Sequence, residues 1–293
     1  MIKKILVFAA ILLGTQAIVH AAPALADRPY VVNNSHILPI HSKFTGKDHE
    51  LIVILPASYA SHPEKTYPVL YFCDAQWDAP LVSATYGNLN YDNHVPEFIM
   101  VGLSYRTGAE YGVERRGDYT PTAIDPISGK SAKFLDFITR EVAPLIEKRF
   151  RGAKTERVLA GNSLGGLFTV SAAYMAPGFF DGFVAISPAA GWDNNYLIKL
   201  DDEFAKSGKA LKGRMFLSYG TAEFAPFREP ILKFQNHLAA RKYPDLQLLN
   251  YVMEGVDHSS SKGEGYARGL SWVWKAKKPA GPSGLEREMA LTK

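Results

Sequence analysis

The chain has 293 residues, of which 47% are hydrophobic and 21% charged, and its formal net charge is +4. This composition is ordinary for a globular protein with one sizeable core, and the small charge gives no indication of a nucleic-acid surface. Cys73 is the only cysteine, so no intramolecular disulfide can form. No CxxC, HExxH or calcium-loop pattern occurs in the sequence, and we therefore expect no metal or other cofactor.

The first 26 residues are predicted to be a secretory signal peptide of bacterial style. Lys3 and Lys4 form a positive start, an apolar run follows at residues 5–13, and the small-x-small sequence at residues 24–26 fits a cleavage site. Because the apolar run is too short for a membrane span, no stable membrane anchor is expected after cleavage. We expect a periplasmic or secreted protein in which residues 27–293 form a single domain that ends in a loose polar tail at 277–293.

Strands and helices are predicted to alternate along the rest of the chain. After one or two edge strands within residues 27–47, apolar runs predict strands at 51–55, 68–73, 98–103, 157–160, 182–186, 215–219 and 246–253. Helical spacing is found at 131–150, from 166 onward, and at 196–206, 229–242 and 263–275, while residues 77–92 hold either a helix or a long loop. This alternation predicts a mostly parallel sheet with helices on both faces.

Residues 104–130 are polar and show no clear period. A loop of that length is more often a substrate-facing lid or rim than a simple connection. We therefore expect this segment to border a binding site.

The segment Gly161-Asn162-Ser163-Leu164-Gly165 has the G-x-S-x-G spacing of a nucleophile elbow. A predicted strand precedes it and an apolar helical run follows it, which is the context that this motif requires. Glycine at the flanking positions lets the backbone turn sharply and lift the Ser163 hydroxyl out of the sheet. Because the following helix points its N–H groups at the serine, Leu164 N–H is a candidate donor to an oxyanion.

A serine hydroxyl needs a base to take its proton, and imidazole suits that role at neutral pH. The α/β-hydrolase fold has the chain order serine, acid, histidine, which leaves His237 and His258. His237 lies inside a helical pattern, whereas His258 follows the last predicted strand, where the base is expected. For the acid we favour Glu223, which follows the 215–219 strand, over Asp193, and both stay open at this point.

The second oxyanion donor in this fold comes from the loop after the third strand, here residues 74–77, so the N–H of Ala75 or Gln76 is the candidate. Arg115 and Trp77 are candidates for substrate binding. Together with Tyr86 and Tyr91 they suit an anionic or aromatic ligand, and they equally suit a solvated loop with packed aromatic residues.

With these residues the chain resembles the esterase D and enterochelin-esterase family of α/β-hydrolases, which includes feruloyl esterases and mycolyl transferases. The matching segments span most of the mature chain: Tyr67 to Tyr71 with Asp74, Val101 to Leu103, Arg115 or Arg116 with Asp118 to Pro121, Gly161 to Gly166, Gly220 with Glu223, and His258. The resemblance implies the acid role for Glu223, the second oxyanion donor at Gln76, and a substrate rim at residues 118–121. The chain departs from the family at Ala75, where glycine is frequent, and at Asn162, where histidine is frequent.

The sequence thus predicts an exported serine esterase that hydrolyses a small-molecule carboxylic ester through Ser163, His258 and Glu223, with an acyl-enzyme intermediate. The acyl group is left open among siderophore, feruloyl, acetyl-sugar and short-chain esters. Two alternatives remain at this point: an acyltransferase that uses the same triad, and a secreted binding protein that has kept the fold without activity.

Overall fold

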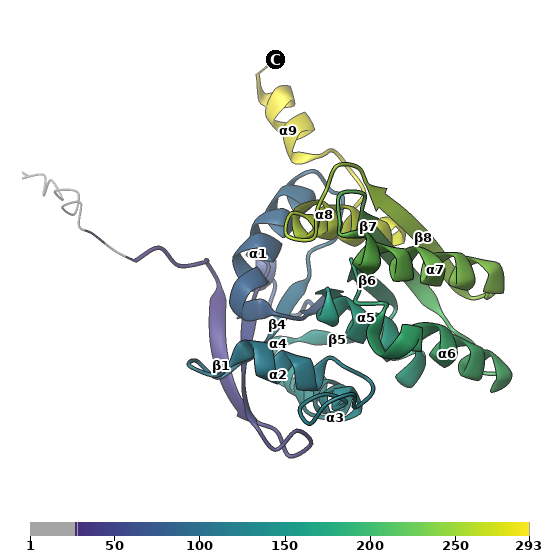
Figure 1. Cartoon of the computed structure of the whole chain (residues 1–293). Coiled ribbons are helices and arrows are strands. Elements are labelled where there is room, and N and C mark those ends of the chain that lie inside the picture. The colour runs from purple at the N-terminus through teal and green to yellow at the C-terminus, as the bar shows by residue number, and fades with distance from the viewer. Residues whose placement is uncertain (1–26, 28, 293) are drawn as a thin grey trace, which may run out of the picture. The chain divides into compact units, whose positions relative to one another are not determined.

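The computed structural model of the protein describes residue 27 and residues 29–292, and the described residues from Val32 onward form one compact unit. The predicted signal peptide, residues 1–26, lies outside the described residues. The described residues form an eight-stranded sheet in the order β1-β2-β4-β3-β5-β6-β7-β8 (Figure 1). Its strands are β1 Ser35–His41, β2 Asp48–Ile54, β3 Tyr67–Phe72, β4 Ile99–Tyr105, β5 Gly152–Asn162, β6 Gly182–Ile186, β7 Gly213–Gly220 and β8 Leu246–Met253.

The sheet is mostly parallel. Strands β3 to β8 all run in the same direction, whereas β2 pairs antiparallel with both β1 and β4. The carboxyl ends of β3 to β8 therefore meet at one edge of the sheet, which we call the carboxyl edge, and their starts meet at the opposite amino edge. This arrangement confirms the predicted α/β-hydrolase fold.

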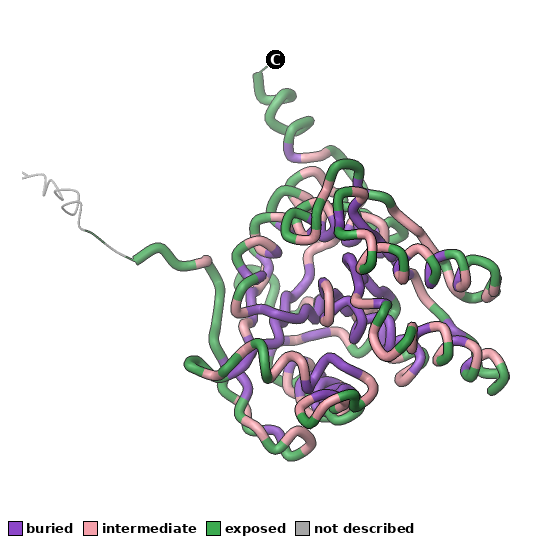
Figure 2. Tube along the Cα trace, viewed as in Figure 1, coloured by how far each residue is buried: buried purple, intermediate pink, exposed green. Residues whose placement is uncertain are grey.

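Helices cover both faces of the sheet. Successive strand residues point to opposite faces, so each face presents apolar side chains against which helices pack. Tyr71 and Leu159 belong to a core cluster that includes residues of α3 to α7, while Phe72 and Ala160 belong to a second cluster with α1 and α8. Figure 2 shows the buried strands between these two layers. The helices are α1 Ala75–Tyr91, α2 Tyr111–Asp118, α3 Ser131–Phe137, α4 Ala143–Phe150, α5 Leu164–Met175, α6 Trp192–Lys206, α7 Ala225–Arg241, α8 Ser261–Val273 and α9 Gly284–Leu291.

Two segments that lacked a clear sequence period contain helices. Residues 77–92, left open between helix and loop, lie almost entirely in α1, and the predicted 104–130 loop contains α2. Helix α2 buries only Gly117 and Asp118, so apolar periodicity cannot reveal it. Its side chains instead form ion pairs with other parts of the chain, between Arg115 and Asp74 and between Asp118 and Lys47.

The predicted helix at 131–150 is interrupted by a π-helical turn at Ile138–Val142 between α3 and α4. Pro144 follows this turn in the first turn of α4. Proline has no N–H to continue the regular i to i−4 hydrogen bonding, which accounts for a widened turn directly before it.

The predicted loose tail differs from the structure over residues 284–291, which form α9. A capping box starts this helix, because Ser283 Oγ accepts from Glu286 N at 3.2 Å and Glu286 Oε2 accepts from Ser283 N at 2.6 Å. Within the part of the chain that the structure describes, no helix combines the length and apolar character that a membrane crossing requires.

Candidate active site

Ser163 occupies a strained turn between β5 and α5. Its backbone angles are φ 59° and ψ −118°, a conformation that residues with a side chain rarely adopt. Three hydrogen bonds hold the turn: Ser163 N donates to Ile186 O at 3.1 Å, and Ser163 O accepts from Leu167 N and Ala189 N at 2.9 Å each. The structure therefore places Ser163 at the carboxyl edge in the conformation of a nucleophile elbow.

The glycines of the motif are required by close packing. A Cβ at Gly161 would lie 2.4 Å from the carbonyl carbon of Gly165, and a Cβ at Gly165 would lie 2.9 Å from the Cβ of Cys73. Cys73 itself is fully buried against the elbow, so it acts as a small core residue. Side chains at either glycine would push the serine turn away from the start of α5.

His258 and Glu223 lie together at the same edge. His258 Nδ1 and Glu223 Oε1 are 2.8 Å apart. The His258 ring also packs edge to face against the Phe227 ring, with the ring centroids 4.6 Å apart. The Glu223 side chain is completely buried, and its second oxygen accepts from Gly220 N at 3.1 Å. A buried carboxylate on Nδ1 fixes the tautomer that leaves Nε2 to act as a base.

The Ser163 hydroxyl and the second ring nitrogen of His258 are not occupied by other contacts among the described residues. Among residues 29–292, neither Ser163 Oγ nor His258 Nε2 has a hydrogen-bond partner within the protein. The bond between a nucleophile and its base is often long in an unliganded enzyme and tightens when substrate binds.

The structure distinguishes between the two acids left open by the sequence. It brings Glu223 to His258, whereas Asp193 lies at the start of α6 and forms no side-chain hydrogen bond with a described residue. His237 is bound elsewhere, with its Nε2 2.9 Å from Asp201 Oδ2 on α6.

The two predicted oxyanion donors lie at neighbouring helix starts. Leu164 is the first residue of α5 and Gln76 the second residue of α1, so neither N–H has a partner within its own helix. The helix starts meet at the elbow, since a Cβ at Gly165 would lie 3.5 Å from Asp74 Oδ2, directly before α1. N–H groups without partners in their own helices are what the predicted oxyanion role requires.

Arg115 is bound to the turn before α1. Its Nε and Nη2 donate to the two carboxylate oxygens of Asp74 at 2.8 Å each, and Asp74 N donates to Tyr119 Oη at 3.0 Å. Burial alone lowers the pKa of Arg115, but its hydrogen bonds to Asp74 and the charge of that carboxylate raise the pKa above its usual value. These contacts hold the turn in which Asp74 has the αL conformation at φ 57°. The substrate-binding role of Arg115 stays a prediction.

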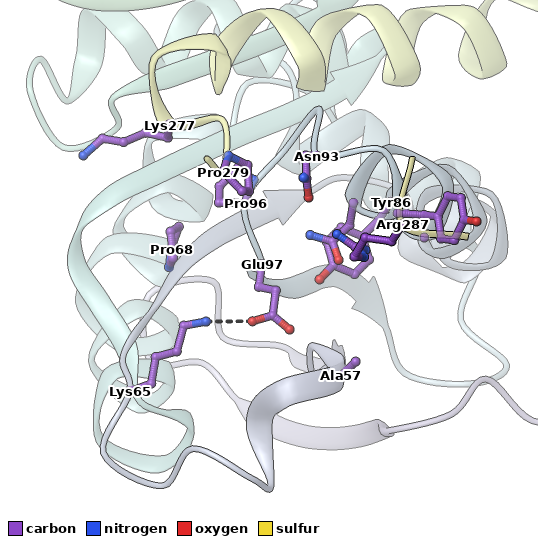
Figure 3. Close-up of a pocket in the computed structure, with 13 residues that line it drawn as sticks. Ala57, Lys65, Pro68, Tyr86, Asn93, Pro96, Glu97, Lys277, Pro279 and Arg287 are labelled. Atoms are coloured by element: carbon purple, nitrogen blue, oxygen red, sulfur yellow. Dashed lines mark hydrogen bonds and ion pairs between the residues drawn. The ribbon is translucent and has the colours of Figure 1, made fainter. Parts of the chain in front are cut away.

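Of the predicted aromatic residues, only Trp77 lies beside these groups. It is 51% exposed, its ring meets Tyr111 edge to face, and the Arg115 guanidinium lies 5.9 Å from its ring centre. Tyr86 and Tyr91 instead line a groove at the amino edge of the sheet (Figure 3). They therefore lie toward the opposite edge of the sheet from Ser163.

The predicted substrate rim at residues 118–121 is largely interior. Tyr119 is fully buried, and Lys47 Nζ lies 2.8 Å from both oxygens of the buried Asp118. Tyr119 accepts the hydrogen bond from Asp74 N and so contacts the turn before α1, whereas Asp118 binds Lys47 between β1 and β2. These contacts were missed from the sequence because the partners lie far away along the chain.

The described residues contain one group of three potential metal ligands, Asp201, Asp202 and His237. Arg241 already donates to both carboxylates, through Nε to Asp201 and through Nη2 to Asp202. This arginine neutralises the acidic pair in the position that a cation would take.

The chain is similar to known esterases in sequence and to solved structures in fold. The Esterase family model, described as "Putative esterase", matches residues 42–221. Ferri-bacillibactin esterase BesA of Bacillus subtilis is 24% identical over 195 residues, covering 61% of this chain and 67% of that protein. Siderophore triacetylfusarinine C esterase of Aspergillus fumigatus is 29% identical over 209 residues, covering 60% and 70%. The crystal structure of the BES protein from Bacillus cereus has a TM-score of 0.77 at 23% identity, covering 85% of this chain and 99% of that chain.

Proposed function

Because this chain belongs to the Esterase family and is a carboxylic ester hydrolase, we propose that it is exported and hydrolyses siderophore esters through a Ser163–His258–Glu223 triad. The observation that carries the proposed triad is the 2.8 Å contact between His258 Nδ1 and the buried Glu223 carboxylate, at the edge where Ser163 forms the strained elbow. Siderophore esters are chosen because two relatives are named for them.

In the proposed mechanism Ser163 Oγ attacks the acyl carbon of the ester while His258 Nε2 takes the hydroxyl proton. Glu223 stabilises the imidazolium through Nδ1–H. The N–H groups of Leu164 and Gln76 hold the oxyanion, and His258 returns the proton to the departing alcohol. Water then attacks the acyl-enzyme with His258 again as the base, which releases the acid and restores Ser163.

The surroundings of the site suit a large substrate. Trp77 directly follows Gln76, Phe224 directly follows Glu223, and the two side chains are 51% and 76% exposed. Exposed aromatic residues next in the chain to a proposed oxyanion donor and to the proposed acid favour a ligand with apolar or aromatic parts that stays partly in solvent. A siderophore with several acyl arms has this character.

The substrate is tested by incubating the protein with bacillibactin, triacetylfusarinine C, a feruloyl ester and p-nitrophenyl acetate, each with and without ferric ion. We expect the siderophore esters to have the highest kcat/KM and to release free acid. Turnover of p-nitrophenyl acetate without cleavage of any siderophore ester would overturn the proposed substrate class. Formation of a new ester in the presence of an alcohol acceptor would instead indicate acyl transfer.

Export is tested separately by expressing the full chain in a bacterium and sequencing the N-terminus of the protein in each cell fraction. We expect a periplasmic or secreted form that begins at Asp27. Retention of residues 1–26 on a cytoplasmic protein would contradict this part of the proposal.

A further inference from the structure

Asn162, the residue directly before the nucleophile, connects the elbow to the loop that carries His258. It is the last residue of β5 and is 4% exposed. Its Nδ2 donates to Ser261 Oγ at 3.1 Å and to Ile186 O at 3.3 Å, and Ser261 Oγ donates to His258 O at 2.8 Å. A carbonyl oxygen can only accept, so the direction of every bond in this chain is fixed.

The loop at residues 254–260 depends on such bonds for its position. Five of its seven residues are exposed, so apolar packing contributes little to holding it. On the side of β7, Ala222 N donates to Val256 O at 3.0 Å and Glu223 binds the His258 ring. On the side of the elbow, the hydrogen-bonded link from Asn162 through Ser261 reaches the main-chain carbonyl oxygen of His258.

The same amide also fixes the serine. Ile186 O accepts from both Asn162 Nδ2 and Ser163 N, so one carbonyl at the end of β6 anchors the nucleophile and the start of the link. Ser261 is fully buried, which keeps water from replacing either of its bonds. Asn162 and Ser261 therefore form a continuous hydrogen-bonded link between the end of β5 and the main chain of His258.

We propose that Asn162 and Ser261 are positioning residues that hold His258 at the distance from Ser163 required for proton transfer. The inference rests on the proposed function, because it concerns the same serine and histidine. An asparagine amide does not titrate, whereas the histidine frequent at this position in the resembling family does. The link therefore keeps its donor at every pH at which the enzyme is folded.

The test compares Asn162→Ala, Ser261→Ala and the double variant, with p-nitrophenyl acetate as substrate. We expect kcat to fall by about 10- to 100-fold with KM unchanged, since a misplacement of about 1 Å can cost 100-fold. Labelling by a fluorophosphonate should slow in parallel. The double variant should be no slower than the slower single variant, because both substitutions break the same link.

Ser171→Ala is the matched control. Ser171 is also a fully buried serine, it lies on α5, and its hydroxyl has no partner among the described residues. We expect its kcat and labelling rate to equal those of the wild type. If Asn162→Ala does not fold, Asn162→Leu removes the donor while keeping a similar shape and allows the same comparison.

Two results would overturn the inference. One is a lower melting temperature for the Asn162 and Ser261 variants with kcat per folded molecule equal to that of Ser171→Ala, which would indicate a purely structural bond. The other is a double variant whose loss is the product of the single losses. Activity retained by Ser163→Ala would contradict the proposed function itself, whereas an inactive Ser163→Ala beside a fully active Asn162→Ala would contradict only the link.

Discussion

The two edges of the parallel sheet carry polar clusters that are built differently. At the amino edge, a groove of about 740 Å³ is lined by residues that precede β3 and β4 together with the end of α1 and the C-terminal segment (Figure 3). Its Lys65–Glu97 ion pair is 2.7 Å long, and the side chains are 41% and 20% exposed. At the carboxyl edge, Glu223 binds His258 with no exposed surface of its own, beside a serine at φ 59°.

On the proposed function, the largest groove of the two edges is not the one that carries the chemistry. An ion pair that faces water contributes little energy and constrains little, since solvent screens it. Reactive sites often contain a buried carboxylate that orients an imidazole. They also often contain a residue in a strained backbone conformation that the surrounding packing maintains. Substitutions at the carboxyl edge should therefore change activity, and their counterparts at the amino edge should not.

Ser163→Ala should have the largest effect. Without the hydroxyl no acyl-enzyme can form, and we expect kcat for p-nitrophenyl acetate to fall by about 10⁶-fold, as when a catalytic serine is removed elsewhere. The amino-edge control is Ser58→Ala, which removes a hydroxyl bound to Glu97. Its kcat should equal that of the wild type, measured on variants whose circular dichroism shows that they are folded.

Glu223→Gln should come next, with kcat lowered by about 10⁴-fold, because an amide that donates to Nδ1 favours the wrong imidazole tautomer. The counterpart is Glu97→Gln, which we expect to leave kcat and KM unchanged. Steady-state kinetics on both variants provide the comparison. A Glu223→Gln enzyme with wild-type kcat would exclude Glu223 as the acid.

Arg115→Met separates a positioning role from substrate binding. If Arg115 fixes Asp74 and through it the start of α1, kcat for a neutral ester should fall by about 100-fold, comparable to the loss of one oxyanion donor. KM should stay the same. Lys65→Met, its counterpart at the amino edge, should have no effect on either constant. A rise in KM confined to anionic esters would instead support the substrate-binding role predicted from the sequence.

A further expected effect is on stability in acid and not on activity. His49 on β2 is buried beside the end of β4, where its ring stacks on Phe137 at 4.4 Å, and burial followed by the charge of Lys47 lowers its pKa from 6.5 to about 4. Below pH 6.5 the unfolded chain therefore takes up a proton that the folded chain takes up only near pH 4. The free energy of unfolding should fall by about 3 kcal/mol between these values, at about 1.4 kcal/mol per pH unit.

Urea unfolding at pH 6.5, 5 and 4 measures this loss. The variant His49→Phe should lack it, whereas His41→Phe should retain it, because the His41 side chain is 67% exposed. An equal loss in all three proteins would show that other groups control acid stability.

The sequence predicted the parts of the molecule that depend on local patterns. The elbow follows from five adjacent residues and its flanking apolar runs, and His258 and Glu223 follow from their places after β8 and β7. The contacts of Arg115 could not be predicted in the same way, because Asp74 lies 41 residues away and only the folded sheet brings them together. The link from Asn162 to Ser261 spans 99 residues and was missed for the same reason.

Other differences have local causes. The capping-box pair Ser283 and Glu286, three residues apart, is a sequence signal for the start of helix α9. The polarity of the surrounding segment instead favoured the prediction of a loose tail. Helix α2 had no comparable signal, because ion pairs and not an apolar face stabilise it. Tyr86 and Tyr91 have the chemistry of ligand-binding residues, but α1 carries them from the carboxyl edge to the amino edge.

The most direct test of the central claim is to label the folded, active protein with a fluorophosphonate and to identify the modified residue by peptide mass spectrometry. We predict a single adduct on Ser163, formed in step with the loss of esterase activity and absent from the Ser163→Ala variant. Complete inactivation with the adduct on another serine, or full activity with Ser163 quantitatively modified, would contradict the proposed mechanism.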